Sequence, residues 1–194
     1  MLKSKNYDIV DWPATDHTEA NEIVGRLFVA DGGKSVHKIL EPTSEPWRPE
    51  MKDYSEAPEL SVYDLWQLQK QRTALQKKYL DRWAACEGLD AILGPTTPYA
   101  APKAGCFKGV SYTSIFNLLD YSSTSFPTEV LGDKSVDVYP ADFKSMGEID
   151  ETAKTDYDPA EIAGIPVSLQ ITCRRLEDEK VMALTAKVVK DLTA

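Results

Sequence analysis

The chain has 194 residues, of which 42% are hydrophobic and 27% are charged. These values are typical of one soluble globular domain, and they exclude a chain that is disordered throughout. Its 22 Lys and Arg residues against 31 Asp and Glu residues give a formal net charge of −9, which argues against a nucleic-acid or anionic-membrane surface. No stretch approaches the ~18 consecutive apolar residues of a membrane span.

The cysteines and histidines do not form a recognisable site. Cys86, Cys106 and Cys173 lack the paired spacing of a disulfide framework or a zinc site, and His17 and His37 stand apart. We therefore expect reduced thiols, no metal and no cofactor. The first residues lack the apolar core of a secretory signal, which predicts a cytoplasmic protein.

The first part of the chain predicts a strand followed by helices. Residues 7–12 alternate loosely before a proline, which predicts a short strand. Asp16, with Glu19 three residues later, is expected to cap an amphipathic helix. A second helical piece is expected over 35–40. The apolar positions of the first helix are Ala20, Ile23, Val24, Leu27 and Phe28.

A long helix follows a connection rich in proline. Residues 41–58 contain four prolines and many charges, which predicts a surface segment with little regular structure. The helix is expected from Leu60 to Cys86, with Ser61 as its cap and Asp64 at the reciprocal position. Its expected buried face consists of Leu65, Leu68, Leu75, Tyr79, Trp83 and Cys86.

The second part of the chain alternates between strand and helix patterns. Strands are expected over 89–93, 123–126 and 165–172, and helices over 111–119 and from 176 onward; the helix after 176 has apolar positions Val181, Leu184, Val188 and Leu192. Residues 132–157 carry seven acidic residues against three lysines and predict a surface excursion. The alternation predicts an α/β fold, a small mixed sheet flanked by helices, in a single domain over 1–194.

Three segments of the chain resemble the C-terminal portion of amidase signature enzymes, with the fungal acetamidase-like branch as the nearest in character. They are Asp90–Pro98 (DAILGPTTP), Tyr112–Tyr121 (YTSIFNLLDY) and Gly164–Gln170 (GIPVSLQ), the last followed by Arg174–Val181. The resemblance implies a fold derived from the C-terminal part of the amidase signature fold.

The same resemblance implies that the family's catalytic apparatus is missing from these residues. Amidase signature hydrolases use a Ser–Ser–Lys triad whose nucleophile lies in a Gly/Ser-rich stretch, and this sequence contains no such stretch. Acyl transfer needs an activated nucleophile and donors for the oxyanion. We therefore expect a truncated amidase-like protein without amidase activity. Ser168 stands where the family usually has Gly. Either sequence drift or a rebuilt pocket would explain this difference.

In the family, the segment over 112–121 packs close to the substrate cleft. Buried phenols and carboxylates can act as general acids and bases, so the candidate catalytic residues are Tyr121, Asp120 and Tyr112. The candidate substrate-binding residues are Thr97, Asn117, Ser168 and Gln170. Structural hydrogen bonding is the alternative for each of them. A reactive thiol at Cys106 and a reactive amine at Lys103 are further candidates, for which simple exposure is the alternative.

The predicted function is to bind a small hydrophobic metabolite and to catalyse a non-hydrolytic acid–base step, such as isomerisation, dehydration or cyclisation, in a biosynthetic pathway. The alternative is a non-catalytic binding protein or the C-terminal subunit of a split amidase. Without a catalytic half, apolar surface would be exposed, so we expect a homodimer. The expected partner is a small molecule, and neither a nucleic acid nor a membrane is expected.

Overall fold

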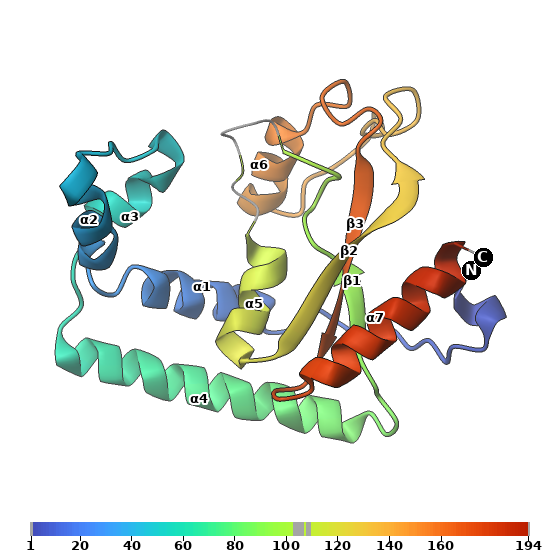
Figure 1. Cartoon of the computed structure of the whole chain (residues 1–194), viewed down its shortest axis with the longest axis horizontal. Helices are drawn as coiled ribbons and strands as arrows, with labels where there is room; N and C mark the ends of the chain where they lie inside the picture. The colour runs from blue at the N-terminus through green and yellow to red at the C-terminus, as the bar shows by residue number, and fades with distance from the viewer. Residues whose placement is uncertain (1, 103–106, 108–109, 194) are drawn as a thin grey trace. The chain divides into compact units, whose positions relative to one another are not determined.

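The computed structural model describes residues 2–102, 107 and 110–193. Figure 1 shows its helices and strands, coloured along the chain. Two compact units are present: unit 1 consists of Met1–Pro13, Asp90–Phe116 and Asp120–Ala194, and unit 2 of Ala14–Leu89 and Asn117–Leu119. The candidates Lys103 and Cys106 lie outside the described residues.

Unit 1 is built on a three-stranded sheet. The strand order is β1 (Ile92–Pro95), β3 (Pro166–Cys173), β2 (Ser122–Leu131), and both outer strands pair with β3 in antiparallel fashion. The α/β class is confirmed, but the expected mixture of strand directions is not found among these strands. A parallel pairing does occur outside them, as a bridge between Gly132 and Ala163.

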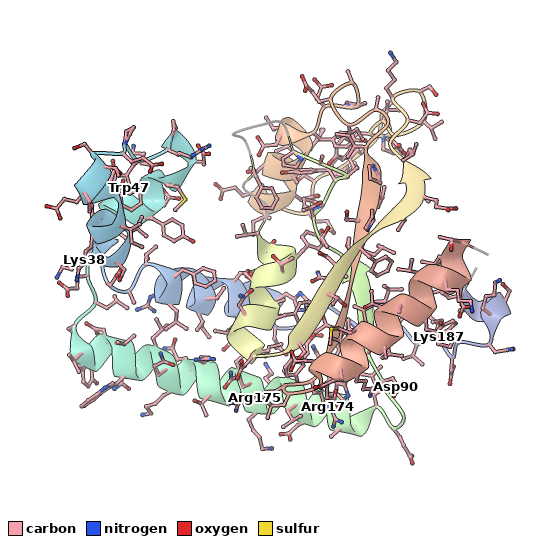
Figure 2. All side chains as sticks on the ribbon, in the orientation of Figure 1. Lys38, Trp47, Asp90, Arg174, Arg175 and Lys187 are labelled. Atoms are coloured by element: carbon pink, nitrogen blue, oxygen red, sulfur yellow. The ribbon has the colours of Figure 1, made fainter. Side chains whose placement is uncertain are left out.

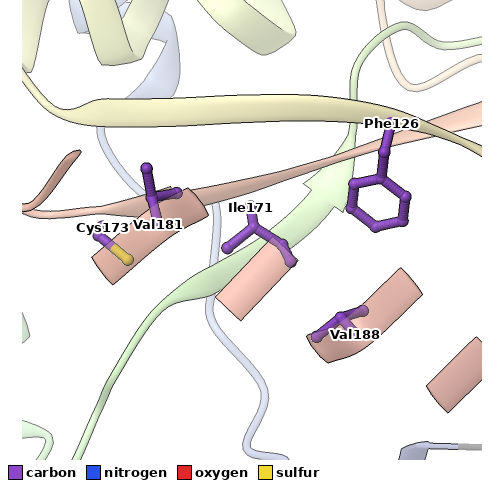
Figure 3. Close-up of a cluster of buried hydrophobic side chains, with 5 residues drawn as sticks. All are labelled: Phe126, Ile171, Cys173, Val181 and Val188. Atoms are coloured by element: carbon purple, nitrogen blue, oxygen red, sulfur yellow. The ribbon is translucent and has the colours of Figure 1, made fainter. Parts of the chain in front are cut away.

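One face of this sheet is covered by α7 (Asp178–Thr193), which packs against β2 and β3 (Figure 1). Side chains alternate between the two faces of a strand, so every second residue of β3 faces this helix. Figure 3 shows the resulting core, in which Val181 and Val188, two of the apolar positions predicted for the last helix, are buried. The buried side chains are Phe126, Ile171, Cys173, Val181 and Val188.

The segment around Tyr7 is not the strand that the sequence predicts. After a short 3-10 helix, Leu2–Lys5, residues 7–14 have no regular structure. The Tyr7 hydroxyl instead donates to Asp191 Oδ2 at 2.8 Å and accepts from Lys187 Nζ at 2.8 Å. This side-chain anchoring on α7 (Lys187 is labelled in Figure 2) fixes the segment without strand pairing.

The remaining helices of unit 1 are α5 (Ser111–Leu119), whose last three residues belong to unit 2, and α6 (Glu148–Asp156). The bounds of α5 are those predicted. Helix α6 lies within the segment over 132–157, where the sequence shows no sustained periodicity; three acidic residues in its first turn favour its formation.

Unit 2 is mainly helical. Helix α1 (His17–Phe28) packs against α4 (Val62–Ala85), and four of the six side chains expected on the buried face of α4 are fully buried: Leu68, Leu75, Tyr79 and Trp83. The predicted cap is confirmed, because Ser61 Oγ accepts from the Asp64 N–H at 3.1 Å. Helix α2 (Lys34–Leu40) is also where it was predicted.

The connection over 41–58 is more regular than predicted. It contains the 3-10 turns η2 (Glu41–Thr43) and η3 (Pro49–Met51) and the short helix α3 (Lys52–Glu56). Both 3-10 turns have proline in their first turn, where its fixed φ favours a helical start. The prolines therefore begin short helices here, which the sequence analysis did not anticipate.

Asp16 does not cap α1 as predicted. Its backbone is left-handed, with φ of 72°, and its side chain accepts no hydrogen bond from the helix. The carboxylate instead pairs with Lys78 Nζ and lies 3.6 Å from Arg82 Nη1, both on α4. Two cations compete better for a carboxylate than a backbone amide does, so Asp16 links the two helices. None of the helices described is long and apolar enough to cross a membrane.

Candidate functional site

A cavity of about 480 Å³ lies within unit 1. It is lined by residues from three parts of the chain, together with Tyr157 and Ile162. These are Pro95 and Thr97–Ala100 at the end of β1 and after it, Val130, Gly132 and Val136–Pro140 in a second segment, and Val167 and Ser168 at the start of β3. Three segments that are distant in sequence therefore form its wall. A concave site of this size is suited to a small organic ligand.

The wall of the cavity is mostly apolar, with a few polar groups. Prolines, valines, an isoleucine and three tyrosines form most of it, and the polar side chains are Thr97, Asp137 and Ser168. Apolar walls with a few polar groups are typical of pockets that bind small molecules, because the former supply affinity and the latter supply orientation.

Gly132 sets the width of one part of this wall. Its N–H donates to Ile165 O at 2.9 Å and its carbonyl accepts from the Gly164 N–H at 2.8 Å. A Cβ atom at this position would lie 2.4 Å from Ile162 O, which is closer than real Cβ atoms come. Only glycine therefore allows this close approach of the two backbones.

The tyrosines beside the cavity form an aromatic cluster. The Tyr139 and Tyr157 rings lie 5.3 Å apart edge to face, and Phe143 lies 4.6 Å from Tyr139 in the same manner. The Tyr157 hydroxyl donates to Asp137 O at 2.6 Å. Burial, followed by the nearby charges of Asp150, Tyr112 and Glu151, raises the pKa of Tyr139, so its phenol stays protonated at neutral pH.

Comparison with known proteins identifies the family. The family model described as Amidase matches residues 2–182. The chain belongs to the amidase family. An acetamidase of Aspergillus oryzae is 32% identical over 196 residues, covering 97% of this chain and 36% of that protein. An acetamidase of Emericella nidulans is 30% identical, and the match again covers 97% of this chain and 36% of that protein.

The fold of this amidase-family chain matches solved relatives. A fatty acid amide hydrolase superposes with a TM-score of 0.86 at 28% identity, over 98% of this chain and 34% of that one. The chain thus spans about 36% of the length of the acetamidases it matches. The predicted family is confirmed, while the assignment to the C-terminal portion stays a prediction.

Two of the predicted substrate-binding residues of the amidase-family chain lie together in the cavity wall. Thr97 Oγ1 donates to the carbonyl oxygen of Tyr99, two residues later. The Ser168 carbonyl oxygen accepts two hydrogen bonds from Thr96, one from its N–H at 3.4 Å and one from its hydroxyl at 3.3 Å. These bonds hold the chain after β1 against the start of β3, which brings Thr97 and Ser168 to one wall.

Gln170 is buried, with 4% of its surface exposed, and is not part of the cavity wall. Its Nε2 donates to Pro95 O and to Tyr112 O, both at 2.8 Å. Both amide hydrogens are therefore used to join β1 and the start of α5 to β3. This is the structural hydrogen bonding that the sequence left open for this residue.

The three predicted acid–base residues are divided between the ends of α5. Tyr112, in the first turn, interacts electrostatically with Tyr139, which contributes to the raised pKa of Tyr139. Asp120 follows the last turn and pairs with Arg175 Nε at 2.7 Å, with Tyr121 beside it (Arg175 is labelled in Figure 2). None of these three residues lines the cavity. Asn117 is exposed and belongs to unit 2.

The sequence analysis missed Tyr99, Asp137, Tyr139 and Tyr157. Three of them lie in the segment over 132–157, which has no sustained periodicity and was interpreted only as an acidic excursion. Two tyrosines among seven acidic residues are the signal that could have indicated a binding surface, because aromatic residues are not needed in a merely solvated segment.

Cys173 does not offer a nucleophile. Its Sγ is fully buried and donates to Asp90 O at 3.6 Å, and burial raises its pKa to about 11. A buried protonated thiol is unreactive. Within the described parts of the chain, no three His, Cys, Asp or Glu side chains are grouped so that they could hold a metal ion.

Proposed function

We propose that this amidase-family chain binds a small, largely apolar organic molecule in the 480 Å³ cavity of unit 1, and that these 194 residues do not hydrolyse amides by themselves. The observation that carries the proposal is the cavity wall, where the hydroxyls of Thr97 and Ser168 stand beside tyrosines and valines. Burying apolar ligand surface contributes about 25 cal/mol per Å², and the hydroxyls would orient the ligand.

The proposed chemistry is a non-hydrolytic acid–base step. Such a step needs one group that accepts a proton and one that donates a proton or a hydrogen bond to the charge that develops. The Asp137 carboxylate and the protonated phenol of Tyr139 line the cavity and suit these two roles. Tyr112 does not line the cavity, but its phenol interacts electrostatically with that of Tyr139, so it is the member of the predicted catalytic set that we assign to this proposal.

An acyl-enzyme route needs a nucleophile, a base and oxyanion donors that act as a unit. The proposal excludes hydrolysis because this sequence contains no Gly/Ser-rich stretch, in which the family's nucleophile lies. The purified chain is expected to turn over acetamide and anilides no faster than buffer. A fluorophosphonate probe is expected to leave every serine unlabelled. Stoichiometric labelling of one serine would contradict this part of the proposal.

Binding can be tested with the neutral fluorophore N-phenyl-1-naphthylamine. Its emission is expected to rise saturably with one site per chain. Val138→Asp places a charge in the cavity wall and is expected to weaken binding at least about fivefold, because a carboxylate is costly to desolvate. The matched control is Val10→Asp, at an exposed valine outside the wall, which is expected to bind the fluorophore as the unchanged chain does. Equal loss in both variants would contradict the proposal.

A second candidate function is supported by the start of α4 in unit 2. Val62, Tyr63 and Trp66 are 64%, 67% and 64% exposed and follow one another closely at the start of the helix, and contiguous exposed apolar side chains indicate an interaction site. The matched acetamidases carry about two thirds of their length outside the matched region. We propose as the alternative that this face binds such a segment, as in a split amidase.

Co-expression with the unmatched part of the Aspergillus oryzae acetamidase tests this alternative. A complex that Trp66→Ser weakens would support it. A second copy of the chain is the competing occupant, and light scattering that gives a dimer, converted to a monomer by Trp66→Ser, would assign the face to the predicted homodimer instead.

A further inference from the structure

We infer that the molecule bound in the unit 1 cavity carries a positive charge: it is an amine with an aromatic or aliphatic body, and its ammonium group lies against Asp137 and the tyrosine rings. The inference rests on the proposed function, in which this cavity binds a small organic molecule. It names the chemical class of that molecule, which neither the family nor the relatives indicate.

The charge of the cavity wall is the first argument. Asp137 is the one charged side chain among the described residues that line the cavity, and no lysine, arginine or histidine is among them. Asp137 Oδ2 accepts from the Asp133 N–H at 2.7 Å. A carboxylate has about four lone-pair sites on its two oxygens, so this bond leaves it able to accept from an ammonium group.

The aromatic side chains are the second argument. Tyr99, Tyr139 and Tyr157 all line the cavity. The Tyr157 hydroxyl bonds to the Asp137 carbonyl, which holds that ring beside the residue that carries the charge. Ring faces attract ammonium ions, by about 0.5–2 kcal/mol each, so a carboxylate with several rings is a suitable receptor for an amine.

The surrounding charges are the third argument. Burial, and then the charges of Asp150 and Glu151, raise the pKa of Tyr139, so an added anion there is disfavoured. Among the described residues, Lys154 Nζ lies over the Phe143 ring at 5.2 Å and Lys134 interacts with Asp133, and neither lysine lines the cavity. The carboxylates of Asp150 and Glu151 act on the Tyr139 phenol, and the carboxylate of Asp137 belongs to the cavity wall.

Three probes of one shape and different charge test the inference: 2-(2-naphthyl)ethylamine, 2-(2-naphthyl)ethanol and 2-naphthylacetate. Their dissociation constants are measured at pH 7 and low salt. The amine is expected to bind about three to ten times more tightly than the alcohol, as one partly exposed charge pair allows, and the carboxylate most weakly. Added salt is expected to reduce the advantage of the amine, because it screens exposed charges.

Asp137→Asn removes the charge and retains an oxygen that can accept from the Asp133 N–H. It is expected to lower the affinity of the amine to that of the alcohol and to leave the alcohol unchanged. Asp142→Asn is the matched control, since it removes the same charge from the same exposed segment but outside the cavity wall. It is expected to change neither affinity by more than about twofold, because surface charges at a distance are screened.

The outcomes separate the inference from the proposed function. If the alcohol binds and the amine binds no better, or if Asp137→Asn weakens both alike, the charge inference is overturned while the binding function stands. If none of the three probes binds, both are overturned.

Discussion

Gln170 Nε2 donates a 2.8 Å hydrogen bond to the carbonyl oxygen of Tyr112, and the same nitrogen donates to Pro95 O. One buried amide thus holds the central strand, an edge strand and the start of α5 together beside the cavity. The relationship explains why an amide is found in the interior of unit 1, where an apolar side chain is more usual.

Replacement of this amide is expected to destabilise the fold. Gln170→Met keeps the length of the side chain but leaves the Pro95 and Tyr112 carbonyls without this donor, at a cost of about 1–3 kcal/mol. Urea unfolding followed by circular dichroism measures this cost. The control Gln69→Met, at an exposed position of α4, is expected to lie within about 0.5 kcal/mol of the unchanged chain. An unchanged midpoint for Gln170→Met would refute the structural role.

Gly132 and Gly25 are expected to respond in opposite ways to alanine. Gly132→Ala places a Cβ against Ile162 O, so the free energy of unfolding should fall by about 2 kcal/mol or more and the fluorophore should bind less tightly. Gly25 lies in α1 with nothing within 4 Å of a Cβ, so Gly25→Ala should stabilise the chain by about 0.5–1 kcal/mol. Thermal unfolding of the two variants tests both signs.

Asp16 is expected to contribute to stability through its charge. Its side chain is only 10% exposed and pairs with Lys78 and Arg82. Asp16→Asn tolerates the left-handed backbone but loses both ion pairs, at a cost of about 1–2 kcal/mol. Asp81→Asn, which removes an exposed i, i+4 pair with Lys77, is expected to cost no more than about 0.5 kcal/mol. Equal losses in the two variants would show that the position of Asp16 has no special importance.

The raised pKa of Cys173 predicts a loss of stability in alkaline solution. The thiol is held protonated up to about pH 11 in the folded chain, against an ordinary value of 9.0. Between these values the unfolded chain loses its proton first, so stability is fully present below pH 9 and falls as the pH rises toward 11. The full effect is about 3 kcal/mol at most, from 1.36 kcal/mol per pH unit.

Cys173→Ala isolates this effect from the tyrosines and lysines that titrate in the same range. The difference in stability between Cys173→Ala and the unchanged chain is expected to shrink from pH 8 to pH 11. In the native chain at pH 8, iodoacetamide should modify Cys86, which is half-buried, and spare Cys173. A difference in stability that does not change with pH would contradict the raised pKa.

Local patterns predicted α1, α2, α4, α5 and α7, because their determinants lie within the segments themselves, but they did not predict α3 or α6. Ser61 and Asp64 fix the start of α4, and the four buried side chains of that helix repeat at helical spacing. The segment at Tyr7 and the cap at Asp16 were predicted wrongly for the opposite reason. Their partners, Asp191 and Lys78, are 184 and 62 positions away, and no local pattern encodes them.

The candidate site was predicted only in part for the same reason. Thr97 and Ser168 were found because they lie in segments that resemble the family, and both line the cavity. Asp137, Tyr139 and Tyr157 lie outside the three segments on which the resemblance was based, and folding brings them to the same wall. Gln170 shows the limit of residue type as a guide, since a polar side chain in a family segment serves to join backbones.

The division of the chain between its two units bears on the order in which they form during synthesis. Unit 2 draws on residues 14–89 and 117–119, so it is complete once the ribosome has passed residue 119. Unit 1 combines residues 1–13 with segments that extend to the end of α7. The hydrogen bonds of Tyr7 with Lys187 and Asp191 therefore form only after α7 has been synthesised. Closing so long a loop is slow, because its entropy must be lost before its contacts form. Nascent chains that stop before α7 therefore hold a finished helical unit and all three strands of the sheet, but the apolar face that α7 covers is exposed, and chaperones bind such surfaces.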